Sequence, residues 1–165
     1  MDIIYLEHYK GNEKLGIEAI PPIGVVDSDD AGIDLRAAIS HTINLDPGES
    51  VVIPSGIKLH IGSHTLHNIY SDIGIYGAIV PRSGLGFKHF LRLANTIGII
   101  DAGFQNEIMI KIRNEGDERL SINRGDRICQ MVFHFYVKNV EFNEVDNFGT
   151  DTTRSLSGIG SSGVR

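Results

Sequence analysis

The sequence predicts an all-β domain, built as a barrel or a sandwich from many short strands. Residues 107–113 (EIMIKIR) place isoleucine at every second position, and a period of two is typical of a half-buried strand. Other apolar runs are similarly short, and clusters of turn-forming residues separate them, at 46–49 (DPGE), 114–117 (NEGD) and 123–126 (NRGD). Many short strands at this spacing favour a β-barrel or a β-sandwich.

Three further apolar runs predict strands. Ser50–His60 (SVVIPSGIKLH) is typical of an extended segment, with a turn expected at Pro54–Gly56. Ile75–Val80 (IYGAIV) is a second short run. Ile128–Val137 (ICQMVFHFYV) is rich in branched and aromatic residues, which favour strands.

Three segments depart from the strand pattern. Ser83–Ala94 (SGLGFKHFLRLA) predicts the single helix, and the Ser83 hydroxyl is a candidate N-cap. Gly62–Gly74 lacks a clear period and predicts a loop. Residues 143–165 are rich in Ser, Thr and Gly and poor in apolar side chains, which predicts a mobile arm unless a ligand holds it. We therefore expect a β core over residues 1–142 and an arm over 143–165.

Length and composition limit the classes of protein that the chain can form. Its 165 residues suit one domain, and 41% hydrophobic with 22% charged residues is ordinary for a globular protein. A net charge of −6 argues against nucleic-acid binding, although a small phosphate ligand remains compatible with it. The absence of an apolar run of membrane-spanning length and of a signal peptide predicts a cytoplasmic protein without membrane attachment. The single cysteine, Cys129, lies in an apolar run and is expected to be a buried thiol.

Five segments contain more Gly, Ser, Arg and Asp than structure alone requires. They are 31–38 (AGIDLRAA), 81–88 (PRSGLGFK), 95–104 (NTIGIIDAGF), 124–130 (RGDRICQ) and 154–163 (RSLSGIGSSG).

The second and fifth of these segments have the composition of phosphate-binding loops. Glycine lets the backbone approach an oxyanion, and serine donates a hydrogen bond. Arginine adds a cation that can form two parallel hydrogen bonds to the anion. Each segment also has a plainer interpretation: a helix cap for the second and disorder for the fifth.

Three polar residues in the other segments are candidates for chemistry. Asp101 follows an apolar run and precedes a glycine turn, so that its carboxylate could activate a water or merely stabilise the turn. Asn95 offers both a donor and an acceptor for reading a base, although it too could be a turn residue. Asp34 lies inside an apolar strand and needs a partner, either Arg36, a structural hydrogen bond or a hydrated Mg²⁺. The dispersed histidines do not suggest a zinc site.

Taken in order, the five segments closely resemble the five motifs of the trimeric dUTPase family, from about residue 31 to residue 163. The resemblance implies a distorted jelly roll of antiparallel strands, a homotrimer, and a C-terminal arm that closes over a site built by other subunits. It also implies Mg²⁺-dependent hydrolysis of dUTP to dUMP and pyrophosphate, which lowers dUTP and supplies dUMP for thymidylate synthesis.

The resemblance assigns a role to individual residues. Asp101 matches the aspartate that activates the attacking water, and Asp34 matches the aspartate associated with the hydrated Mg²⁺. Uracil recognition corresponds to Asn95, Gly98 and Met109. Phosphate contacts correspond to Arg82, Ser83, Gly84 and Gln130. The grip of the arm on the γ-phosphate corresponds to Arg154, Ser161, Ser162 and Gly163.

The chain departs from the family pattern at three places. Phe104 stands where the family usually has tyrosine, and its ring should still pack under the deoxyribose. Ile159 stands where the family usually has a phenylalanine that stacks on uracil, so closure of the arm should lose the stacking contribution. Residues 62–74 resemble an insertion, which could bind a protein partner, although a neutral surface loop is the favoured interpretation.

Two alternative functions are weighed against dUTP hydrolysis. A deaminase of dCTP shares this fold, but it needs a glutamate in the strand after the third motif, where this chain has Lys111. A nucleotide-sensing module that binds proteins without turnover is the other alternative. The presence of Asp34, Asp101, Arg82 and Arg154 argues against lost activity.

Overall fold

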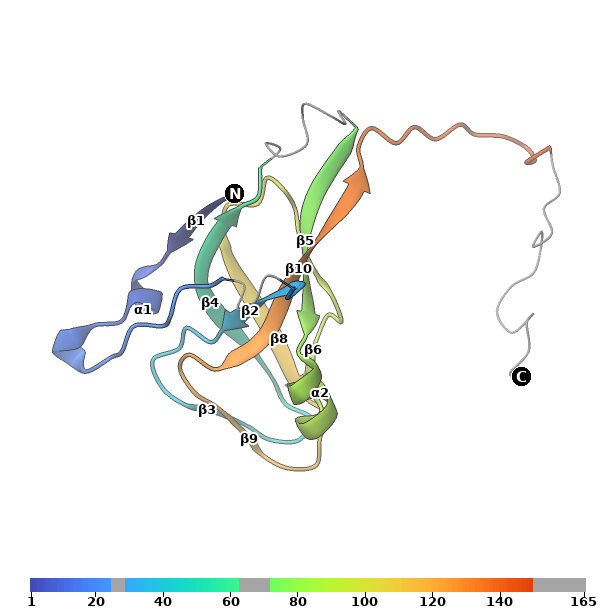
Figure 1. Cartoon of the computed structure of the whole chain (residues 1–165). Coiled ribbons are helices and arrows are strands. Elements are labelled where there is room, and N and C mark those ends of the chain that lie inside the picture. The colour runs from blue at the N-terminus through green and yellow to red at the C-terminus, as the bar shows by residue number, and fades with distance from the viewer. Residues whose placement is uncertain (25–28, 63–71, 150–165) are drawn as a thin grey trace.

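A computed structural model describes residues 1–24, 29–62 and 72–149 (Figure 1). Ten strands dominate the described chain, together with two short helices and one 3₁₀ turn. The strands are β1 (Asp2–Tyr5), β2 (Gly32–Arg36), β3 (Ile43–Leu45), β4 (Ser50–His60), β5 (Ile73–Pro81), β6 (Leu91–Leu93), β7 (Gly98–Ile100), β8 (Glu107–Asn114), β9 (Leu120–Ile122) and β10 (Arg127–Val137). The helical elements are α1 (Glu7–Lys10), η1 (Glu13–Leu15) and α2 (Ser83–His89).

The strands form three antiparallel sheets. One has the order β1-β4-β8-β6, the second has the order β2-β10-β5-β7, and β3 pairs with β9 in a small third sheet. Every pairing among these described strands is antiparallel, and the predicted all-β class is confirmed.

The hydrophobic core lies where the inner faces of the two four-stranded sheets meet. In β8 the three isoleucines at 108, 110 and 112 are buried, whereas Met109 and Lys111 are exposed. The alternation predicted from the sequence is therefore confirmed, because successive side chains of a strand point to opposite faces. Cys129 and Met131 of β10 are also fully buried in this core, as expected for the cysteine.

Strand β4 continues through the point where the sequence predicts a turn. The pairing with β8 passes from Pro54 opposite Met109 to Lys58 opposite Glu107, so the predicted turn at Pro54–Gly56 is instead an irregularity within one strand. Gly56 lies there at φ 71°, a conformation that favours glycine. The turn-forming residues do produce a turn-like backbone conformation at Gly56, but the chain does not reverse direction there.

The predicted helix Ser83–Ala94 is five residues shorter in the structure. Phe90 adopts a left-handed conformation with φ 52°, and its N–H bonds to Leu85 O, which ends α2 at His89. Residues Leu91–Leu93 then pair with β8 as strand β6. The expectation of one helix was also wrong, because α1 forms near the N-terminus.

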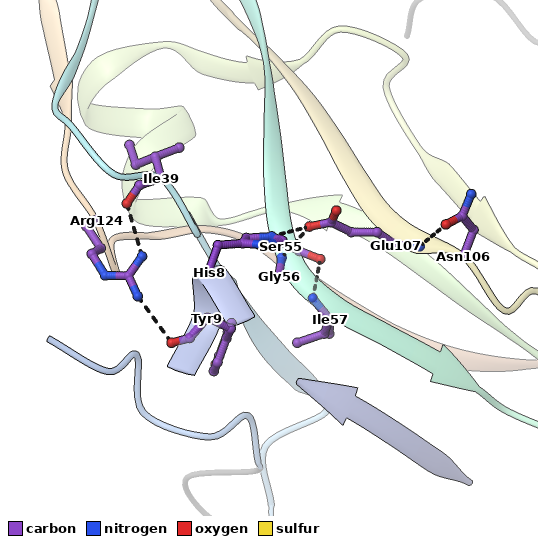
Figure 2. Close-up of polar contacts among 9 residues, drawn as sticks. All are labelled: His8, Tyr9, Ile39, Ser55, Gly56, Ile57, Asn106, Glu107 and Arg124. Atoms are coloured by element: carbon purple, nitrogen blue, oxygen red, sulfur yellow. Dashed lines mark hydrogen bonds and ion pairs between the residues drawn. The ribbon is translucent and has the colours of Figure 1, made fainter. Parts of the chain in front are cut away.

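The side chain of Arg124, in the turn before β10, holds the N-terminal segment against the domain. The Arg124 guanidinium donates to Tyr9 O at 3.2 Å and to Ile39 O at 3.1 Å (Figure 2). It also donates to Glu18 O at 2.9 Å. Three backbone carbonyls from separate segments thus share one cation.

Beyond the body of the domain, β5 and β10 continue side by side as a two-stranded extension, after which the chain leads away (Figure 1). Residues 139–149 are exposed. The predicted 62–74 loop is shorter at its end, because Ile73 and Gly74 belong to β5, and residues 63–71 lie outside the described chain. Among the described residues, no helix combines the length and apolar character needed to cross a membrane.

Candidate active site

The residues expected to contact phosphate gather round one pocket. We call it the phosphate-side pocket, and its volume is about 420 Å³. The expected residues among its lining are Asp34, Arg82, Ser83, Gly84 and Gln130. They come from β2, from the start of α2 directly after β5, and from β10. Gln130 pairs across the sheet with both Asp34 and Val80, so the pocket lies on the face to which these positions point.

Two guanidinium groups meet the Asp34 carboxylate in this pocket. Arg82 Nε lies 2.7 Å from Asp34 Oδ1, and Arg127 Nη1 donates to Asp34 Oδ2 at 3.1 Å. Arg36, considered from the sequence as a partner, instead donates to Gly125 O at 2.9 Å. The carboxylate therefore holds two cations beside the pocket, and Arg127 is a site residue that sequence reasoning missed. Its signal was present as the second arginine of the fourth segment (RGDR).

The start of α2 presents backbone toward the phosphate-side pocket. Arg82 occupies the N-cap, and within residues 72–149 no side-chain hydrogen bond caps this helix. The expectation that Ser83 caps the helix was therefore wrong, because Ser83 is already its first helical residue. A Cβ built on Gly84 would lie more than 4 Å from all described atoms beyond its neighbours and its helix backbone. The Gly84 backbone is thus open to a ligand.

Gln130 is held by close packing on the opposite wall. Its Nε2 donates to Pro81 O at 3.2 Å, and a Cβ on Gly32 would collide with its Oε1. Glycine at position 32 therefore leaves room for this amide.

The residues expected to recognise uracil line a second pocket, which we call the base-side pocket and which has a volume of about 400 Å³. Asn95, Gly98, Phe104 and Met109 all lie in its wall, which is formed by the β6–β7 turn, β7, the β7–β8 connection and β8. A Cβ on Gly98 would lie 3.3 Å from Ile79 Cβ and 3.6 Å from Asn95 Nδ2. Glycine at position 98 therefore keeps the slot open beside the asparagine amide.

Asp101 comes directly after β7 and begins a turn. Its carbonyl accepts the Phe104 N–H at 3.0 Å, and its side chain is exposed. Among the described residues it lines neither of the two pockets. Phe104, at the other end of the turn, packs partly against the core.

The two pockets remain separate within one chain. Across the described residues their linings have no member in common. Gln130 and Asp34 point to one face of the β2-β10-β5-β7 sheet, whereas Ile79, which lines the base-side pocket, belongs to the opposite face. The residues expected at the phosphates and the residues expected at the base therefore lie in two different pockets of one chain.

A larger pocket of about 510 Å³ shares Arg82 and Arg127 with the phosphate-side pocket. Its lining includes Arg119, which is paired with Asp46. The Arg119 hydrogen bond holds the pKa of the Asp46 carboxyl below its usual range. Apart from Arg82, this pocket contains none of the residues expected to bind the nucleotide.

Cys129 lies in the core behind the phosphate-side pocket. Burial, followed by the nearby Asp34 charge, raises the pKa of its thiol to about 12. A thiol with this pKa stays protonated at neutral pH and is a poor nucleophile. Cys129 therefore packs the sheet and takes no chemical part.

The described domain thus combines antiparallel sheets with an amide-lined slot and an arginine-lined pocket. The family model described as dUTPase matches residues 18–163. A protein of Hahella chejuensis named deoxyuridine 5'-triphosphate nucleotidohydrolase is 39% identical over 154 residues, which cover 93% of each chain. The chain belongs to the dUTPase family.

Solved structures show the same fold at lower identity. The dUTPase of Staphylococcus bacteriophage 80alpha with dUPNHPP has a TM-score of 0.76 and 24% identity, covering 99% of this chain and 98% of that one. A dUTPase variant from phage phi11 of S. aureus, described as revealing the coordination of a structural Mg(II) ion, has a TM-score of 0.66 and 22% identity, covering 89% and 97%. The predicted arm residues Arg154, Ile159, Ser161, Ser162 and Gly163 lie outside the described residues.

Proposed function

We propose that the protein hydrolyses dUTP to dUMP and pyrophosphate, at sites built between copies of the chain in a homotrimer. The observation that supports this most directly is the pair of separate pockets, one suited to a pyrimidine ring and one suited to a chain of phosphates. Family membership adds the substrate class. Such an enzyme would lower dUTP and supply dUMP for thymidylate synthesis.

The base-side pocket would select uracil through hydrogen bonds in a narrow slot. The Asn95 amide and the backbone groups near Gly98 and Met109 offer donors and acceptors, and a cytosine would mismatch them. Discrimination by unsatisfied hydrogen bonds is the stronger kind. The Phe104 ring would pack beneath the deoxyribose and exclude a 2′-hydroxyl.

The phosphate-side pocket would hold the triphosphate by charge and by backbone approach. Arg82 and Arg127 supply guanidinium groups, Ser83 a hydroxyl, Gly84 an open backbone and Gln130 an amide. In this proposal, Arg154 and the Ser161–Gly163 segment of another copy close over the γ-phosphate, with Ile159 above the base.

The donor set fits a Mg²⁺ ion that arrives with the triphosphate. Asp34 and Asp30 both line the pocket and provide the carboxylate oxygens that Mg²⁺ prefers. The described residues contain no group of three acidic, histidine or cysteine side chains that could cage a metal. Asp34 would therefore contact the ion through bound water, and the ion would supply charge neutralisation on the phosphates.

Asp101 would activate the water that attacks the α-phosphorus. The exposure of this side chain directly after β7 supports the role, because the carboxylate is open to a water and to a nucleotide held between copies. The carboxylate accepts a proton from the water as the new P–O bond forms, and the bond to the pyrophosphate oxygen breaks. The nucleotide then leaves as dUMP and pyrophosphate.

The test is the turnover of Asp101→Asn beside the wild-type chain, with Mg²⁺ and either dUTP or dCTP. Pyrophosphate release from dUTP by the wild type is expected, and the variant should bind a non-hydrolysable dUTP analogue while losing turnover by about 10²–10⁴-fold. Ammonia released from dCTP would indicate a deaminase. Nucleotide binding without turnover by the wild type would indicate a sensing module.

A further inference from the structure

Strand β8 begins where its regular pairing with β4 is interrupted. Residues 55–57 of β4 fall between the paired positions Pro54 and Lys58, opposite the single residue Ile108. Gly56 is packed tightly in this irregularity, since a Cβ there would lie 2.7 Å from Ala38 Cβ and 2.8 Å from Tyr9 Cδ2. The Gly56 N–H therefore has a partner outside the regular ladder.

The Glu107 carboxylate is that partner. Its Oε1 accepts the Gly56 N–H at 2.9 Å and lies 2.7 Å from His8 Nε2 (Figure 2). From the same N-terminal segment, Leu6 N–H donates to Gly56 O at 2.8 Å. One carboxylate oxygen thus joins helix α1, the irregularity of β4 and the start of β8.

Glu107 also belongs to the wall of the base-side pocket. It precedes Met109 by two residues, and its N–H donates to Asn106 Oδ1 at 2.8 Å. Its side chain is only 20% exposed. A shift of this residue would therefore move the backbone of Met109 and change the width of the slot.

We propose that Glu107 is a positioning residue for base recognition, held in place by His8. The inference rests on the proposed function, because it assigns the base-side pocket to uracil. Hydrogen-bond recognition needs its donors and acceptors to be held within about 0.5 Å. Loss of the clamp made by His8, Glu107 and Gly56 should therefore weaken binding of the base and leave the chemical step nearly unchanged.

The experiment compares Glu107→Ala, Glu107→Gln and His8→Ala with the wild type. Glu107→Ala should weaken binding of a non-hydrolysable dUTP analogue about tenfold and raise KM to match, with kcat within about twofold, because a hydrogen bond to a charged group is lost. Glu107→Gln should recover most of the affinity, since its amide oxygen still accepts the Gly56 N–H. His8→Ala should weaken binding about threefold.

Lys10→Ala provides the matched control. It removes the exposed 2.9 Å ion pair between Lys10 and Glu7 on the same helix and should leave binding unchanged. Circular dichroism and thermal melting establish which variants are folded. If Glu107→Ala does not fold, the affinity of His8→Ala decides the question.

Three results would overturn the inference: wild-type affinity in folded Glu107→Ala, wild-type affinity in His8→Ala, or a loss confined to kcat. Binding without pyrophosphate release by the wild type would refute dUTP hydrolysis alone, since the affinities of the variants for the non-hydrolysable analogue still report on the clamp. A wild-type chain that binds no deoxyuridine nucleotide would overturn both proposals.

Discussion

Replacing Gly84 with alanine should stabilise the protein and weaken its grip on the triphosphate. Gly84 lies in the first turn of α2, and a Cβ there would lie more than 4 Å from all described atoms beyond its neighbours and its helix backbone. The added methyl group therefore meets no steric resistance. Alanine is favoured over glycine within a helix by about 0.5–1 kcal/mol, which corresponds to a rise in Tm of about 1–4 °C for a domain of this size.

The same methyl group would project into the phosphate-side pocket that Gly84 lines. An oxyanion held away from the backbone loses hydrogen bonds to N–H groups, because these weaken steeply beyond about 3.2 Å. Loss of one such charge-assisted bond costs about 1.5–3 kcal/mol, so KM for dUTP should rise about ten- to hundredfold. Stability and affinity are thus expected to change in opposite directions.

Gly86→Ala is the matched control for this prediction. Gly86 lies in the same helix, a Cβ there also meets nothing within 4 Å among the described residues, and it does not line the phosphate-side pocket. The measurements are thermal melting and initial rates of pyrophosphate release against dUTP concentration. A KM for Gly84→Ala within twofold of that for Gly86→Ala would refute the phosphate-contact reasoning, and a lower Tm in both would refute the helix reasoning.

Three further predictions concern stability and the arm. Asn114→Ala should lower the free energy of unfolding by about 2–4 kcal/mol in a urea titration, because this buried amide donates to Leu45 O and Glu118 O and accepts from Gly116 N; a loss below about 0.5 kcal/mol would contradict that account. Burial raises the pKa of Tyr9 to about 12, so the stability it contributes should be complete below pH 10 and be lost as pH rises toward 12. The Tyr9 hydroxyl also donates to Pro21 O at 2.6 Å, so Tyr9→Phe should be less stable than the wild type at pH 8, with a gap that narrows above pH 10, and a constant gap would argue against this titration. Ile159→Phe should lower KM for dUTP by restoring a ring that can stack on uracil, worth about 0.5–1.5 kcal/mol; steady-state kinetics that show an unchanged or higher KM would count against stacking.

The sequence by itself determined the fold class and the chemistry of the two pockets. The alternation of isoleucine in β8 is a local property of a strand with one buried face, so it was readable without tertiary information. The glycines and polar residues of the second and third segments likewise predicted an anion pocket and a base slot. The expected residues Asp34, Arg82, Ser83, Gly84 and Gln130 do meet in one pocket, and Asn95, Gly98, Phe104 and Met109 meet in the other.

The tertiary structure decided which groups are partners and where elements end. Asp34 pairs with Arg82 and Arg127, which are distant in sequence, although Arg36 is only two residues away. Helix α2 stops at His89, and the residues after it pair as β6 with β8, a strand some twenty residues further along the chain. Local propensity does not contain such non-local pairing.

The contact between His8 and Glu107 is the clearest example of a non-local pairing that the sequence does not predict. The two residues are 99 positions apart, and no sequence pattern connects them. Only folding brings the N-terminal segment against the interrupted ladder between β4 and β8, where a carboxylate can satisfy a backbone N–H that regular pairing leaves aside. The sequence therefore determined which polar and charged groups are present. The fold determined which of them contact one another, including the contacts of Glu107 at the base-side pocket, because a hydrogen bond depends on distance in space and not on distance along the chain.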